Sequence, residues 1–175
     1  MGFQRLVPIS FASHKGSVLD FRFMAASSAL YTLCSSLLVV FLYSWRFTVN
    51  SENQHHLHDV YWGVQLAYMG TIVAHLLIII LSVCLIFAIF KERTGIITQW
   101  VVVNISLMAF EAVCCCYSNV LRDHINHRFD AVCKAEIVFF ISRLIFNVVS
   151  LWCVMKFLRN IHAGKSYRPP EVIEL

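Results

Sequence analysis

The chain has 175 residues, of which 59% are hydrophobic and 14% are charged, with a formal net charge of +4 and a mean hydropathy of +0.70. Ordinary soluble domains contain about 45–50% apolar and about 25% charged residues, so the composition excludes that class. It indicates an integral membrane protein in contact with the lipid bilayer. We expect no nucleic-acid partner and no cofactor.

Four apolar runs are long enough to cross the hydrocarbon core, which takes about 20 helical residues. They lie at about residues 23–45, 66–90, 96–117 and 137–158. The predicted fold class is an all-α membrane protein, a four-transmembrane-helix antiparallel bundle with short loops. Residues 1–22 then form an N-terminal tail, residues 23–158 the transmembrane domain and residues 159–175 a C-terminal tail.

Small residues recur at helical spacing in the first two spans. Ser28, Thr32 and Ser36 repeat every four residues in the first span. Gly70 and Ala74 have the same spacing in the second span. Such rows let helices approach closely, although small residues are also common in membrane helices in general, and both explanations stay open.

The first outer loop contains three histidines, His55, His56 and His58, followed by Asp59. Imidazole and carboxylate groups at this spacing could hold a transition metal. However, no cysteine or second cluster accompanies them, and we expect a solvated polar loop with no bound metal.

The turn between the second and third spans is short and basic. Lys91 and Arg93 lie at the end of the second span, where cations are favoured by the helix dipole. Gly95 is expected to take the left-handed conformation that ends a helix. The two spans are therefore predicted to form an antiparallel hairpin.

Two charged residues lie inside apolar runs, Glu111 in the third and Arg143 in the fourth. A charge in hydrocarbon costs on the order of 3 kcal/mol, so it usually has a partner or a function. Each lies six residues from the outer end of its span, which places both about 9 Å below the same boundary. We predict a structural intramembrane ion pair between Glu111 and Arg143.

Further polar residues extend this pair into two facing stripes, because they follow helical spacing. The stripes consist of Asn104, Glu111 and Ser118 in the third span and of Arg143, Asn147 and Ser150 in the fourth.

His75, in the second span, is the third ionisable residue within the membrane. Two interpretations stay open for it. It could be a neutral hydrogen-bonding residue, or it could belong to a relay that carries protons or ions together with Glu111 and Arg143.

Four cysteines lie near the outer end of the third span and in the loop after it. Cys133 with one of Cys114, Cys115 or Cys116 could form a disulfide in an oxidising compartment. The triplet also resembles a palmitoylation cluster, but the predicted orientation places it on the outer face, away from cytoplasmic acylation.

Aromatic residues near the predicted boundaries are typical of the interfacial belt of membrane proteins. We expect this role for Trp45, Tyr61, Trp62 and Trp100. At the C-terminus, Ile173 and Leu175 have the spacing of a PDZ-domain ligand, which binds through strand addition and capture of the terminal carboxylate. A plain tail is the alternative.

The distribution of Lys and Arg predicts the orientation in the membrane. Nine lie in the two tails, the short turn and the inner end of the fourth span, and four lie in the two longer loops. The positive-inside rule then places both termini in the cytoplasm. The nine are Arg5, Lys15, Arg22, Lys91, Arg93, Lys156, Arg159, Lys165 and Arg168; the four are Arg46, Arg122, Arg128 and Lys134.

The layout of the whole chain, with four spans, short cytoplasmic termini, a tight basic inner turn and two modest outer loops, resembles the small tetraspan membrane proteins of arthropods, the Pasiflora-like septate-junction components. More loosely, it resembles lysosomal tetraspans. Claudins are disfavoured, because Tyr61-Trp62-Gly63 is not accompanied by a cysteine pair in the first outer loop.

Two classes of function follow. The first is a structural or scaffolding component of the plasma membrane at a cell junction, which assembles as a homo- or hetero-oligomer with other membrane proteins. The second is a lysosomal or endosomal transporter or transporter accessory that uses Glu111, Arg143 and His75. An enzyme is not expected, because no nucleophile and base share a motif.

Overall fold

The computed structural model describes residues 11–52, 61–126 and 131–164. Within these ranges the chain forms four helices and no strand: α1 (Phe11–Glu52), α3 (Tyr61–Lys91), α4 (Thr94–Asn126) and α5 (Ala131–His162). All four are long and apolar enough to cross a membrane. The predicted fold class, an all-α four-helix membrane bundle, is confirmed.

The helices extend beyond the apolar runs at both ends of the bundle. The largest difference is in α1, which begins at Phe11, whereas the first span was predicted to begin at residue 23. Residues 11–22 of the predicted tail are therefore helical. Hydropathy marks only the part of a helix that meets hydrocarbon, whereas a helix satisfies its backbone hydrogen bonds internally and can continue into the polar region.

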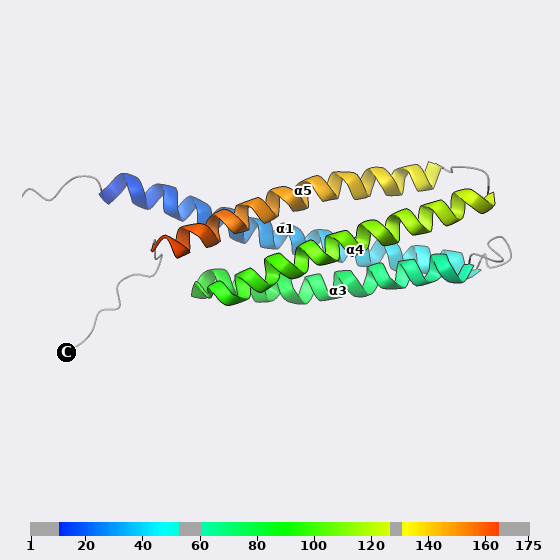
Figure 1. The fold of residues 1–175 in the computed structure, drawn as a ribbon, viewed down its shortest axis with the longest axis horizontal. Helices are drawn as coiled ribbons and strands as arrows, with labels where there is room; N and C mark the ends of the chain where they lie inside the picture. The colour runs from blue at the N-terminus through cyan, green and yellow to red at the C-terminus, as the bar shows by residue number, and fades with distance from the viewer. Residues whose placement is uncertain (1–10, 53–60, 127–130, 165–175) are drawn as a thin grey trace, which may run out of the picture.

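The four helices run antiparallel to their neighbours in the chain (Figure 1). The start of α1 and the end of α5 lie at the same end as the α3–α4 turn, which we call the hairpin end. The end of α1 and the start of α5 lie at the opposite end, which we call the loop end. The α1–α3 and α3–α4 seams are packed more extensively than the α1–α5 and α4–α5 seams.

The α3–α4 turn differs from the sequence prediction in one backbone detail. Glu92, and not Gly95, takes the left-handed conformation, with φ of 53°. The Arg93 N–H donates to the Ala88 carbonyl at 3.0 Å, which satisfies a carbonyl of the last turn of α3. Because α4 already begins at Thr94, Gly95 lies inside its first turn and cannot end α3.

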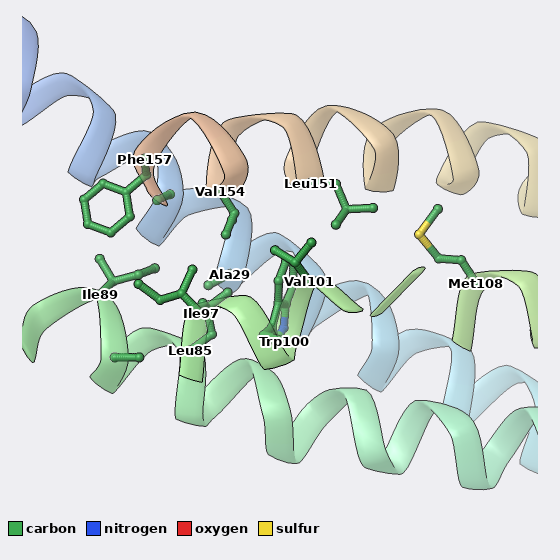
Figure 2. Packing of buried hydrophobic residues seen from close by; sticks show 12 residues of the cluster. Ala29, Leu85, Ile89, Ile97, Trp100, Val101, Met108, Leu151, Val154 and Phe157 are labelled. Atoms are coloured by element: carbon green, nitrogen blue, oxygen red, sulfur yellow. The ribbon is translucent and has the colours of Figure 1, made fainter. Parts of the chain in front are cut away.

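The largest hydrophobic cluster fills the hairpin end of the bundle (Figure 2). Trp100 of α4 lies at its centre and is only 1% exposed, beside Leu85 and Leu151. The prediction of an interfacial role for Trp100 was therefore wrong, because its helix turns that side chain inward. Trp45 and Trp62 lie on the outer surface, 60% and 78% exposed.

Small residues line the tighter seams. Ser28, Thr32 and Ser36 are all buried in α1. The Ser28 and Thr32 hydroxyls donate to carbonyls one turn back in α1, so these two act as small residues whose hydroxyls are satisfied within their own helix. In α3, a Cβ atom added to Gly63 would lie 2.9 Å from Leu121 of α4, so glycine allows close approach there.

Candidate functional site

Glu111 and Arg143 meet inside the bundle, where they are 3% and 4% exposed. The Arg143 guanidinium contacts the Glu111 carboxylate directly, joining α5 to α4. The Arg143 side chain also lies over the Phe139 ring, 5.5 Å from its centroid. A charge at this depth has a low free energy only when an opposite charge and hydrogen bonds compensate for the lost water.

His75 of α3 also belongs to this group, and it is 2% exposed. Its Nε2 atom lies 3.2 Å from Arg143 Nη1 and 3.4 Å from Glu111 Oε2. Its Nδ1 atom lies 3.2 Å from the Ser36 hydroxyl of α1. We call Ser36, His75, Glu111 and Arg143 the central network. It takes one residue from each of the four helices.

The two ring nitrogens of His75 determine how the hydrogen bonds run. When Nδ1 carries the hydrogen, it donates to Ser36 and Nε2 accepts from Arg143. When Nε2 carries a hydrogen, it can no longer accept from Arg143, and Glu111 Oε2 lies 3.4 Å away. The position of one proton therefore decides whether His75 can accept a hydrogen bond from Arg143.

The two predicted polar stripes are buried, and among the described residues the direct polar contact between them is the Glu111–Arg143 pair. Both side-chain polar atoms of Asn104 and the Asn147 Oδ1 atom have no hydrogen-bond partner among the described residues. Ser118 donates to a carbonyl of its own helix. Ser150 is 6% exposed. The stripes therefore line the interior, and the Glu111–Arg143 pair provides a polar connection between α4 and α5 in addition to their hydrophobic packing.

A second polar group, which the sequence analysis missed, lies near the loop end. Arg46 of α1 donates to Glu136 of α5 at 2.6 Å. Arg122 of α4 donates to the Tyr68 hydroxyl of α3 at 3.1 Å, and Arg46 lies 5.9 Å from the centroid of the Tyr68 ring. We call Arg46, Tyr68, Arg122 and Glu136 the loop-end network. Arg46 and Glu136 each lie one residue outside a predicted span, and that shared depth could have revealed their pairing.

The predicted disulfide is not formed: all seven cysteines lie in the described part of the chain, and all are free. The Glu111–Arg143 contact sets the register between α4 and α5 and explains why. Cys133 lies ten residues from Arg143, about 15 Å along α5, whereas Cys116 lies five residues from Glu111, about 7.5 Å along α4. Cys114 and Cys115 lie deeper still, so the thiols differ in depth by more than the roughly 7 Å that a disulfide can bridge between Cα atoms.

Two other predicted sites lie outside the described residues. They are the histidines His55, His56 and His58 and the C-terminal pair Ile173 and Leu175. Within residues 11–52, 61–126 and 131–164, no group of three His, Cys, Asp or Glu side chains is arranged to hold a metal ion.

The fold and its two polar networks define a multi-pass membrane protein whose helices are joined by buried charged side chains. No protein-family model, curated protein or solved structure matches the chain.

Proposed function

We propose that the chain is a non-enzymatic structural or scaffolding protein of the plasma membrane. Its outer surface is apolar along all four helices, with exposed residues such as Phe41, Phe87, Val113 and Val138. That surface can pack side by side with other membrane proteins or with further copies of the chain. The proposed place of action is a cell junction.

The observation that carries this proposal is the central network. It takes one side chain from each helix, and its four members are 1–4% exposed. In lipid there is no hydrophobic drive between helices, so buried polar contacts and close packing must hold a bundle together. The single acidic and single basic member contact each other, so the network needs no further ion from outside. These features are expected of a bundle whose four helices keep one fixed arrangement.

A transporter or transporter accessory of endosomes or lysosomes is the second candidate, and one observation favours it. His75 Nε2 lies 3.2 Å from Arg143 Nη1 and 3.4 Å from Glu111 Oε2, so a proton gained or lost there changes whether His75 can accept a hydrogen bond from Arg143. Intramembrane histidines and carboxylates that move protons occur in pumps and transporters. In this function the central network would carry charge in addition to joining helices.

A double-mutant experiment distinguishes the two candidates. Glu111→Gln and Arg143→Gln, each alone, leave one charge without its partner and should lower stability in detergent. The double variant has no net charge there, and two amides can hydrogen-bond between the helices. For a structural role it should recover most of the stability and keep normal localisation and partner binding. A folded double variant that has lost proton-coupled uptake in reconstituted vesicles would instead establish transport.

The cellular part of the proposal is tested with a tagged protein in polarised epithelium. A lateral belt supports the junction, whereas vesicles that stain for lysosomal markers contradict it. Cytoplasmic termini predict that antibody reaches an N-terminal tag only after the membrane is permeabilised. If Ile173 and Leu175 recruit a cytoplasmic PDZ protein, one residue added after Leu175 should abolish that recruitment and leave membrane insertion unchanged.

A further inference from the structure

A pocket lies between α1 and α3 at the hairpin end of the bundle. It has a volume of about 400 Å³ and is lined by Arg22, Phe23, Ala26 and Phe90. Phe23 and Phe90 are 72% and 59% exposed, so the pocket opens on the outer surface. Arg22 and Phe90 lie at the ends of the predicted spans 23–45 and 66–90. This pocket, which we call the hairpin-end pocket, therefore lies at the edge of the hydrocarbon core.

The Arg22 guanidinium is held at the mouth of the hairpin-end pocket by contacts with α3. Its Nη2 atom donates to the Phe90 carbonyl at 3.2 Å, and its Cζ atom lies 5.2 Å from the centroid of the Phe90 ring. That hydrogen bond uses only one of the guanidinium N–H donors. Nε is buried, but Arg22 as a whole is only partly buried and lines the pocket. A ligand in the pocket can therefore approach a positive charge whose position is already fixed.

The surroundings of the pocket are also net positive. Near the hairpin end, the first turns of α1, the α3–α4 turn and the end of α5 together contain six basic and two acidic residues. Lys156 of α5 lies over the ring of Phe21, which directly precedes Arg22, with Nζ 4.9 Å from the ring centroid. Negative charge on a ligand is therefore favoured here and positive charge is disfavoured. The basic residues are Lys15, Arg22, Lys91, Arg93, Lys156 and Arg159; the acidic residues are Asp20 and Glu92.

The rest of the lining is apolar and extends toward the bilayer core. Ala26 lies about 6 Å deeper along α1 than Arg22. A ligand that fits both parts has an anionic group at the boundary and an apolar body below it. Arginine pairs well with phosphate, because its planar N–H groups match two phosphate oxygens. Basic pockets between transmembrane helices on the cytoplasmic side bind anionic lipid head groups, and the predicted orientation places the hairpin end on that side.

We propose that the hairpin-end pocket binds an anionic phospholipid. Its phosphate accepts hydrogen bonds from Arg22, and the upper part of an acyl chain lies against Phe23, Ala26 and Phe90. A zwitterionic phospholipid also has a phosphate, but its cationic head group would lie among the basic residues of the hairpin end. The bound lipid joins the beginning of the first span to the end of the second.

The test uses the purified full-length chain in a mild detergent and a photoreactive phosphatidylserine, with the reactive group near the top of an acyl chain. We expect cross-links to peptides that contain residues 22–26 and residue 90. Unlabelled phosphatidylserine should compete about fivefold better than phosphatidylcholine with the same acyl chains. Equal competition by phosphatidylcholine would contradict the selection by charge. Equal competition by glycerophosphoserine, which has the head group but no acyl chain, would contradict the apolar part of the site.

A charge variant distinguishes the pocket from a general attraction to the basic end. Arg22→Gln should lower cross-linking about fivefold, because it removes the cation that contacts the phosphate. Arg159→Gln is the matched control: it removes one charge from the same end of the bundle, but Arg159 is an exposed residue of α5 and does not line the pocket. It should leave the cross-linking close to that of the unchanged chain. Equal losses in both variants would overturn the proposed site.

A second variant fills the pocket and leaves Arg22 in place. Ala26→Phe should lower cross-linking to the level of Arg22→Gln, because its ring occupies the space of the acyl chain. Ala109→Phe is the matched control, since Ala109 is an exposed residue of α4 outside the pocket. Circular dichroism and the thermal midpoint show whether each variant is folded. Unchanged cross-linking in folded Ala26→Phe would overturn the proposal, and so would unchanged cross-linking in folded Arg22→Gln.

Discussion

The central network and the loop-end network both join helices through charged side chains, but they differ in depth. Ser36, His75, Glu111 and Arg143 are all at most 4% exposed. In the loop-end network the Arg46 and Glu136 side chains are 15% and 9% exposed. An unpaired charge at the loop end can reach water by a change of rotamer, whereas a charge in the central network cannot.

The networks also differ in the number of partners available to each charge. Arg143 contacts one carboxylate among the described residues, that of Glu111, while Glu111 contacts both Arg143 and His75. In the loop-end network, Arg46 has Glu136 and the face of Tyr68. An ion pair should therefore contribute more to stability in the central network than in the loop-end network. Within the central network, loss of Glu111 should cost more stability than loss of Arg143.

The largest effect is expected for Glu111→Gln, which leaves Arg143 buried without a carboxylate. It should lower the free energy of unfolding by about 3–5 kcal/mol. Arg143→Gln should cost less, because the His75 imidazole, 3.4 Å from Glu111, can then carry the compensating positive charge. Unfolding in detergent micelles measures both. Equal losses would mean that His75 does not substitute for Arg143.

A medium effect is expected for His75→Leu, which keeps a similar size but removes the hydrogen bonds to Ser36 and Arg143. The free energy of unfolding should fall by about 1–3 kcal/mol, because the Ser36 and Arg143 groups left behind are buried and cannot hydrogen-bond to water instead. Thr32→Val is a matched control one turn before Ser36 on α1: Thr32 is 2% exposed, but its hydroxyl donates to the Ser28 carbonyl of its own helix. A larger loss for the control than for His75→Leu would contradict the importance assigned to His75.

A smaller effect is expected for Arg46→Gln or Glu136→Gln in the loop-end network. Because these side chains border the aqueous boundary, each change should cost about 1 kcal/mol or less. Unfolding should be measured at low and high salt, since a partly exposed pair is screened more than a buried one. A loss as large as that of Glu111→Gln would show that depth does not distinguish the two networks.

The smallest effect is expected for Asn104→Leu. Asn104 is 2% exposed, and neither of its side-chain polar atoms has a partner among the described residues. Replacing such a group by an apolar one of similar size is close to neutral or stabilising. Thermal unfolding should give a midpoint equal to or above that of the unchanged chain. A clear fall in the midpoint would mean that Asn104 binds a partner, such as an internal water.

The inward-facing residues show where prediction from the sequence failed. Trp100 was placed at the boundary from its position near the end of a span, yet it lies in the core. His75 was recognised as ionisable, but its contact with Ser36 on another helix was not predicted. In soluble proteins the apolar face of a helix marks the side that turns inward. In a membrane, lipid and protein interior are both apolar, so that signal is weak.

The sequence by itself determined the quantities that vary along a helix axis. Apolar length defines four spans, and the rise per residue places Glu111 and Arg143 at one depth, where their side chains are in contact. Only the tertiary structure decided the rotation of each helix about its axis. That rotation brings His75 and Ser36 to the ion pair and turns Trp100 inward. The rotation of a helix depends on packing against segments far away in the chain. The hydropathy of that helix contains no information about those segments.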